Sequence, residues 1–192
     1  MSLWNTRERW GWPAKLFHWT VAVMILGLAV VGTYMSNFVD DMFVQYDLTQ
    51  RHKSFGFVVF ALALARLAWR LANPVSPDPP AGQPRWKDLV ARWIHRALYV
   101  LMFAIPVSGW LMASASILND DDAYPARIPN EVFGLFELPD PIQPGSEALS
   151  DLLHTIHTWS VYLLAALLVI HVGAALRHHL VNGNSILGRM LF

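Results

Sequence analysis

Cysteine is absent from this chain of 192 residues. That absence excludes disulfides, iron–sulfur clusters, thiolate zinc sites and haem attached covalently through a C-x-x-C-H motif. Acidic residues are also missing from the four longest apolar stretches, at about 15–35, 51–71, 93–112 and 152–176. Without carboxylates at membrane depth, neither a non-haem carboxylate metal site nor a carboxylate proton relay is expected.

The chain is rich in long apolar runs. Hydrophobic residues make up 55% of it, and each of the four stretches comes close to the roughly 20 residues that cross a bilayer as a helix. The expected fold is therefore all-α, an integral membrane four-helix bundle formed by a single membrane domain over residues 1–192. Residues 36–50 are expected to form a short acidic loop, 73–84 a proline-rich linker, and 113–150 the longest loop.

Charge is sorted along the chain although the net formal charge is zero. Eleven of the fourteen Lys and Arg residues fall on the side of the two termini and the 73–84 linker. The positive-inside rule then predicts that both termini are cytoplasmic in a multi-pass protein, and that the 113–150 loop lies on the other side of the membrane. On the opposite side, eleven acids face only Arg51, Lys53 and Arg127.

Two histidines lie within the last apolar stretch. His157 and His171 are fourteen residues apart, which returns a helix almost to the same face and separates the rings by about 21 Å. Each ring could simply hydrogen-bond a neighbouring helix. Two ionisable residues in register near opposite ends of one span favour the other interpretation, two stacked metal or haem sites.

The remaining histidines match these two by depth. His18 and His171 fall near the cytoplasmic ends of their helices, and His52 and His157 near the outer ends. Gly56, one turn after His52, leaves room on that face, as a flat macrocycle would need, although close packing of two helices would also explain it. Facing pairs of neutral imidazoles in an apolar bundle suit haem b held by two histidines, which carries electrons and leaves no open iron position. His95 lies at the level of His18, and spacing alone does not choose between them.

Four segments together resemble the bacterial cytochrome b561 family, related to the b-type cytochrome subunits of hydrogenases. They are FHW at 17–19, HKSFG at 52–56, HRALYVLMFAIPVSGWLM at 95–112, and His157 and His171 followed by AALRHH. The resemblance implies two haem b groups, the inner on His18 and His171 and the outer on His52 and His157. It also implies a multi-pass protein of the bacterial inner membrane, with 113–150 as a periplasmic loop, that transfers electrons between a periplasmic donor or acceptor and membrane quinone. Some members resemble superoxide oxidases, which pass electrons from superoxide to ubiquinone.

Further polar residues are assigned by their depth in the membrane. We expect a quinone head to lie near Lys15, His95, Arg96 and His178, although these groups could instead anchor haem propionates and lipid headgroups. Arg51 and Lys53 flank His52 and could admit superoxide, whereas the acidic face around them would attract a basic cytochrome. No nucleic acid partner is expected.

Three other functions remain open on the sequence. The chain could be a haem b membrane-anchor subunit that relays electrons for a larger dehydrogenase or hydrogenase. It could be a superoxide:quinone oxidoreductase, or a transporter that uses its histidines for metal or protons. A homodimer and a larger redox complex are both compatible with the sequence.

Overall fold

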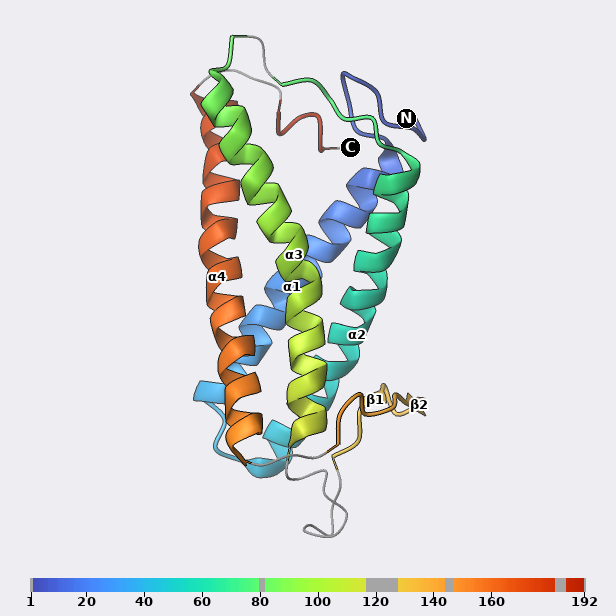
Figure 1. Ribbon diagram of the computed structural model, residues 1–192, viewed down its shortest axis with the longest axis vertical. Helices are drawn as coiled ribbons and strands as arrows, with labels where there is room; N and C mark the ends of the chain where they lie inside the picture. The colour runs from blue at the N-terminus through green and yellow to red at the C-terminus, as the bar shows by residue number, and fades with distance from the viewer. Residues whose placement is uncertain (1, 80–81, 117–127, 144–146, 182–185, 192) are drawn as a thin grey trace. The chain divides into compact units, whose positions relative to one another are not determined.

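The computed structural model describes residues 2–79, 82–116, 128–143, 147–181 and 186–191. The protein is all-α, with four helices that are each long and apolar enough to cross a membrane, and one small hairpin (Figure 1). The helices are α1 (Trp12–Asn37), α2 (Met42–Ala72), α3 (Arg85–Ala115) and α4 (Glu147–Leu180). This confirms the predicted integral membrane four-helix bundle. The side of the membrane that holds the termini, and the single-domain assignment, stay predictions.

The connection between α1 and α2 is shorter than predicted. The sequence predicts a loop over 36–50, but α1 runs to Asn37 and α2 already begins at Met42. The cause is Asp41, whose carboxylate accepts hydrogen bonds from the backbone N–H groups of Phe43 (2.9 Å) and Val44 (3.1 Å). That is an N-cap, which satisfies the free amides of a first helical turn. The loop prediction therefore holds only for 38–41.

The described part of the 73–84 linker is not helical, as predicted. Within the long loop, the hairpin of β1 (Glu131–Val132) and β2 (Phe136–Glu137) was not predicted. The strands are antiparallel, with Glu131 opposite Glu137. The turn between them has positive φ at Phe133 (53°) and Gly134 (68°), a conformation natural for glycine but uncommon for phenylalanine.

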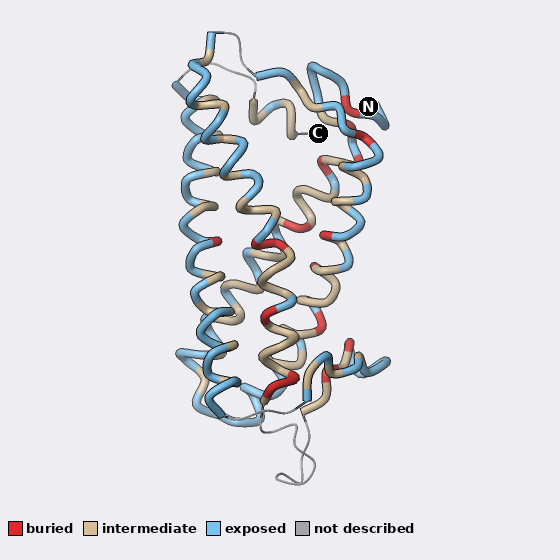
Figure 2. The backbone as a smooth tube through the Cα atoms, in the orientation of Figure 1, coloured by how far each residue is buried: buried red, intermediate tan, exposed pale blue. Residues whose placement is uncertain are grey.

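The chain forms two compact units. Unit 1 comprises residues 1–22, 62–101 and 163–192, and unit 2 comprises residues 23–61 and 102–162. Each unit contains a segment of all four helices. Few of the described residues are buried (Figure 2), and many large apolar residues on the helices are exposed, for example Val30 (68%) and Val169 (74%). Exposed apolar surface of this kind suits contact with lipid chains.

In unit 1, one asparagine joins the N-terminal segment to the chain that follows α2. The Asn5 amide donates to the backbone oxygens of Asn73 (3.4 Å) and Val75 (3.1 Å), and its oxygen accepts from the N–H of Gly11 (2.9 Å). These bonds join the N-terminal segment to the chain that follows α2. They hold in place the start of α1, which carries His18.

In unit 2, polar contacts hold the hairpin segment against the helices. The Lys53 ammonium donates to the carbonyl of Pro129 (2.7 Å), and the Ser54 hydroxyl accepts from the N–H of Phe133 (2.9 Å). Asn130, which is fully buried, donates to the hydroxyl of Ser114 near the end of α3 (3.1 Å). The hairpin is thereby fixed beside the turn of α2 that carries His52.

Candidate functional site

Three histidines from three helices meet in unit 1. The ring centroids of His18 on α1 and His171 on α4 lie 6.3 Å apart, and those of His95 on α3 and His171 lie 5.1 Å apart. Two imidazoles that bind one metal from opposite sides, with metal–nitrogen bonds of about 2 Å, have centroids about 6 Å apart. The spacing of His18 and His171 matches that value, whereas the edge-on contact of His95 with His171 is shorter.

An arginine on α2 completes this cluster. The Arg66 guanidinium donates to Nδ1 of His18 at 3.1 Å and lies over the ring of Tyr99, 5.1 Å from its centroid. Because a guanidinium has no acceptor, Nδ1 of His18 is the acceptor here. Nδ1 of His95 instead meets the backbone oxygen of Ala91 at 2.7 Å, so it carries the hydrogen and leaves Nε2 as a lone-pair donor.

In unit 2, each predicted histidine lies against a glycine of a neighbouring helix. A Cβ at Gly32 on α1 would lie 3.1 Å from Cε1 of His52, and a Cβ at Gly109 on α3 would lie 3.1 Å from Cε1 of His157. Both distances are tighter than ordinary carbon contacts. The absence of a side chain at both glycines is thus what gives each imidazole its place.

The two rings of unit 2 differ in their hydrogen bonds. Nδ1 of His157 meets the backbone oxygen of Ile105 at 3.1 Å and the hydroxyl of Ser108 at 3.0 Å. The carbonyl accepts, so Nδ1 carries the hydrogen and Nε2 is available to a metal, the arrangement found in most ligating histidines. Nδ1 of His52 is buried without a hydrogen-bond partner among the described residues. The described residues therefore leave the hydrogen bond of this nitrogen unmade.

These donor sets fit a haem better than a bare metal ion. Within the described residues, no three His, Cys, Asp or Glu side chains come together as a metal cage. Paired imidazoles are what an iron porphyrin requires from a protein, because its ring supplies the other four ligands. At Gly56, predicted to leave room beside His52, a Cβ would meet nothing within 4 Å.

The other residues predicted at the cytoplasmic end have different surroundings in the structure. Lys15 is buried, and its ammonium donates to the backbone oxygen of Leu191 in the C-terminal segment. Arg96 lies over the ring of Trp93, 5.0 Å from its centroid. His178 is half-buried in the last turns of α4. Among the predicted quinone residues, His95 contacts a proposed haem ligand directly, through the ring of His171.

The two cations beside His52 are both engaged. Arg51 forms an ion pair with Asp47 at 2.9 Å, one helical turn away. Lys53, bound to Pro129, also interacts with acidic side chains of the segment that carries the hairpin. Arg51 and Lys53 are therefore less available to a small anion than their charge alone suggested.

Sequence reasoning missed four residues of these sites: Arg66, Ser108, Gly32 and Gly109. The signal for Arg66 was present, since an arginine inside an apolar span is a functional candidate by default. On the sequence, Gly109 indicates only a bend or a looser turn near the end of α3. Its contact with His157, 48 positions along the chain, has no local signal.

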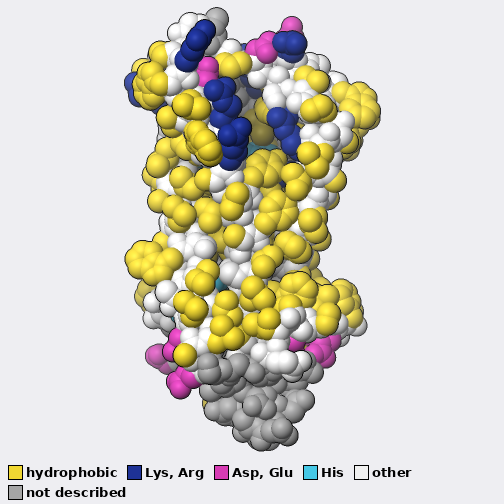
Figure 3. Space-filling model, in the orientation of Figure 1, with side chains coloured by type: hydrophobic (Ala, Val, Ile, Leu, Met, Phe, Trp, Pro, Cys, Tyr) yellow, Lys and Arg dark blue, Asp and Glu magenta, His cyan; other side chains and the backbone are white. Residues whose placement is uncertain are grey.

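The two units differ in their charged side chains, as the sequence indicated. In the view of Figure 3, Lys and Arg gather in unit 1 near the termini, and Asp and Glu at the loop end of unit 2. Apolar side chains cover the helices in both units. Positive charge is thus in excess at the polar end of unit 1 and negative charge at that of unit 2.

Comparison with known proteins gives a consistent result. A family model described as prokaryotic cytochrome b561 matches residues 9–192. Cytochrome b561 homolog 2 of Escherichia coli (strain K12) is 32% identical over 193 residues, which cover 100% of this chain and 95% of that protein. Cytochrome b561 homolog 1 of the same organism is 29% identical over 150 residues, 75% of this chain and 74% of that protein.

Proposed function

Because the chain belongs to the prokaryotic cytochrome b561 family, we propose that it carries electrons across the bacterial inner membrane through two haem b groups, one in each unit. Haem b, transmembrane electron transfer and a multi-pass location in the inner membrane follow from the family and the four spans. The number of haems, their ligands and the redox partners are the new part. The observation that carries them is one pair of histidines from two different helices in each unit: His18 and His171, whose ring centroids lie 6.3 Å apart, and His52 and His157, each packed against a glycine of a neighbouring helix.

We assign the haem of unit 1 to His18 and His171, and the haem of unit 2 to His52 and His157. When bound, each haem supplies a one-electron iron couple. The spacing of 6.3 Å supports His18 over His95 as the partner of His171. An imidazole that binds metal through Nε2 carries its hydrogen on Nδ1, so Nδ1 of His18 could no longer accept from Arg66. Arg66 would then turn to an anion, for which a haem propionate is the natural candidate.

Haem stoichiometry tests this assignment. Each of His18→Ala, His52→Ala, His157→Ala and His171→Ala should lower the haem content from two per chain to one, read from reduced-minus-oxidised spectra. His154→Ala is the matched control, because His154 lies on the same helix, is exposed and is not assigned to iron. If His95→Ala loses a haem while His18→Ala keeps both, the ligand assignment in unit 1 is wrong.

The acceptor or donor at the end of unit 1 is proposed to be a quinone, with ubiquinone as the test molecule. Support comes from His95, whose ring meets that of His171 edge-on and is held by the Ala91 carbonyl. A ring in contact with an iron ligand is well placed to hydrogen-bond a quinone oxygen close to the haem. His95→Ala and His178→Ala should slow haem reduction by quinol while leaving both haems bound. Unchanged rates in both variants would remove His95 and His178 from the quinone site.

At the end of unit 2, the partner is proposed to be a basic periplasmic protein, such as a c-type cytochrome. Eleven acids against three cations support this choice, since charge of one sign steers an oppositely charged partner. Superoxide is the second candidate, and only Arg51 and Lys53 favour it. Arg51→Gln combined with Lys53→Gln should sharply slow haem reduction by superoxide. An unchanged rate would show that superoxide does not enter beside His52.

A further inference from the structure

The hairpin of unit 2 has an apolar tip. Residues 132–136 (VFGLF) are all apolar and stand between Glu131 and Glu137. Turns on protein surfaces are mostly built from Gly, Pro, Asn, Asp and Ser, so a turn of this composition is unusual in contact with water. The exposed side chains of the tip are large and apolar: Leu135 (80%), Phe136 (56%) and Phe133 (48%). Such side chains favour an apolar environment over water.

The backbone of the tip supports the same interpretation. Phe133 has φ of 53°, a conformation that asparagine or glycine adopts at lower cost than phenylalanine. The ring of Phe133 therefore has a role that the turn itself does not require. The N–H groups of the tip also have partners within the protein, since that of Phe133 bonds the Ser54 hydroxyl (2.9 Å) and that of Leu135 the Val132 carbonyl (3.0 Å). Backbone groups without water must be bonded in this way.

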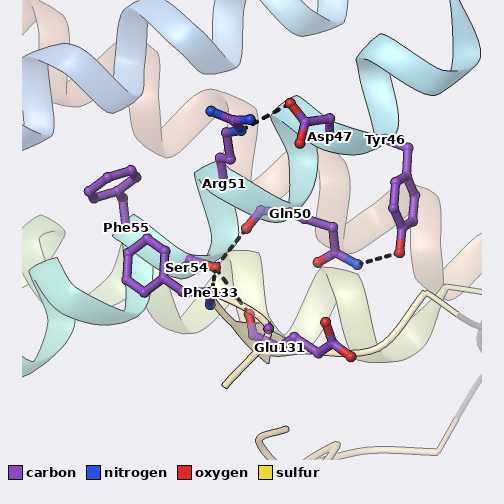
Figure 4. Close-up of a pocket in the computed structure, with 9 residues that line it drawn as sticks. Tyr46, Asp47, Gln50, Arg51, Ser54, Phe55, Glu131 and Phe133 are labelled. Carbon is purple, nitrogen blue, oxygen red and sulfur yellow. Dashed lines mark hydrogen bonds and ion pairs between the residues drawn. The ribbon is translucent and has the colours of Figure 1, made fainter. Parts of the chain in front are cut away.

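The contacts of the hairpin with α2 set its depth in the membrane. The hydroxyl of Ser54 contacts the backbone of the hairpin at Phe133 (2.9 Å) and at Glu131 (3.2 Å), as Figure 4 shows. Ser54 ends the polar segment 50–54 (QRHKS), and residues 55–65 that follow are all apolar. In a spanning helix, the change from polar to apolar residues marks the surface of the hydrocarbon core. The hairpin is therefore bonded to α2 at the level of that surface.

The hairpin also lies against the side of α2 that is exposed. The rings of Phe133 and Phe55 meet edge to face, with centroids 5.0 Å apart, and Phe55 is itself 45% exposed. Figure 4 shows the two rings side by side, and in Figure 1 the hairpin lies to the side of α2. Phe55 is the first residue of the apolar run 55–65. The tip thus continues the exposed apolar surface on which the helices meet lipid chains.

We propose that the tip of the hairpin inserts into the bilayer at the end of unit 2, where phospholipid headgroups meet the acyl chains. Interfacial elements bury their apolar side chains about 5–10 Å into this boundary, and the acids at the base of the hairpin would stay among the headgroups. Because Lys53 and Ser54 bind the same segment, insertion would hold the outer loop beside His52. The inference depends on the four spans and not on the proposed electron transfer.

The lack of cysteine allows one label at a chosen position to test the proposal. Leu135→Cys, labelled with a bimane fluorophore, would be studied as the haem-loaded full chain in phosphatidylcholine nanodiscs. Three quenchers report its surroundings: a lipid with a nitroxide near its headgroup, a lipid with a nitroxide in the middle of the acyl chain, and aqueous iodide. We expect the nitroxide near the headgroup to quench most and iodide least.

Two further labelled positions of unit 2 calibrate the measurement. Glu147→Cys, at the exposed start of α4, should be quenched most by iodide, and Leu26→Cys, exposed within the α1 span, most by the nitroxide in mid-chain. Iodide quenching at 135 as strong as at 147 would place the tip in water. Protection from all three quenchers would mean that protein covers the tip, and quenching like that at 26 would place it in the hydrocarbon core. Each of these results would overturn the proposal.

A variant of the tip shows whether its aromatic rings hold it in the membrane. Phe133→Asn combined with Phe136→Asn suits the positive φ at 133 and keeps the pairing of the strands, so the hairpin should still form. With the label at 135, quenching by the nitroxide near the headgroup should fall by about half or more, because two apolar side chains no longer favour insertion. Phe43→Asn is the matched control, since Phe43 is an exposed phenylalanine of unit 2 outside the hairpin. Unchanged quenching in the double variant, or an equal loss in Phe43→Asn, would contradict insertion through the tip.

Discussion

The two histidine sites hold their rings by different means. In unit 2, Gly32 and Gly109 leave no side chain where His52 and His157 lie, so the rings are placed by close packing. In unit 1, a Cβ at Gly173, two residues after His171, would meet nothing within 4 Å, and a guanidinium contacts His18 directly. A site defined by space fails when volume is added, whereas a site defined by charge responds when charge is removed. The two units should therefore tolerate different substitutions.

The largest expected effect is that of added volume in unit 2. Gly109→Val and Gly32→Val should each displace an imidazole and lower the haem content to about one per chain, because a Cβ alone already lies 3.1 Å from the ring. Gly173→Val on α4 is the control, because the space around Gly173 is open. The pyridine haemochrome assay gives the ratio. Two haems retained in Gly109→Val would show that the ring can move without loss of the cofactor.

The next effect is that of charge in unit 1. Arg66→Met should lower the midpoint potential of the haem in unit 1, because a nearby cation favours the reduced iron, and should loosen that haem if Arg66 holds a propionate. Arg66→Lys keeps the charge and should shift the potential less. The haem of unit 2 serves as the internal standard in the same redox titration. Equal shifts of the midpoint potential in Arg66→Met and Arg66→Lys would mean that the packing of Arg66 on Tyr99, and not its charge, affects the haem.

A third test compares the polar ends of the two units. The rate of electron exchange with a basic protein at unit 2 should fall by about 10-fold or more from low to high salt, because the attraction acts over about one Debye length. Reduction by a neutral quinol at unit 1 should be nearly independent of salt. Stopped-flow absorbance of the haems measures both rates. A salt-independent rate with the basic protein would exclude steering by the acidic loops.

The smallest expected effect is that of one hydroxyl. Ser108→Ala removes one of the two groups at Nδ1 of His157 but leaves the Ile105 carbonyl, so haem retention in unit 2 should weaken by about 0.5–1.5 kcal/mol at most. Thermal release of haem, followed by the Soret band, is the measurement. Ser160→Ala is the control, since the Ser160 hydroxyl only bonds the Ile156 carbonyl of its own helix. A loss larger than that from Gly109→Val would mean that this hydroxyl, and not the space at Gly109, places the ring of His157.

The four spans could be predicted because a bilayer imposes about 20 apolar residues on any helix that crosses it. The start of α2 could not be found that way, because residues 42–50 include polar side chains and lie outside the apolar run. Its signal was local: Asp41 is of a residue type favoured at the N-cap of a helix, and its carboxylate binds the first amides of α2. The hairpin, with two residues in each strand, is too short for any period in the sequence to show.

The histidines of the sites were visible in the sequence, but their surroundings were not. Fourteen-residue spacing placed His157 and His171 on one face of a helix. Nothing along the chain indicated that Gly109 and Ser108 would meet His157, because that contact depends on how α3 is rotated against α4. Arg66 could have been found, since it is a cation within an apolar run. The patterns of residues in the sequence thus do not show how each helix is rotated about its axis against its neighbours.

The contacts between α3 and the ring of His157 have a consequence for the rate of electron exchange. Gly109 lies against the ring, and Ile105 and Ser108 fix its Nδ1, so the imidazole has little freedom to tilt. A group that is already oriented need not move when the charge beside it changes. Less atomic motion means a smaller reorganisation energy for gain or loss of an electron. The residues of α3, none of which is proposed to bind iron in unit 2, would therefore help an electron to enter and leave quickly under a small driving force.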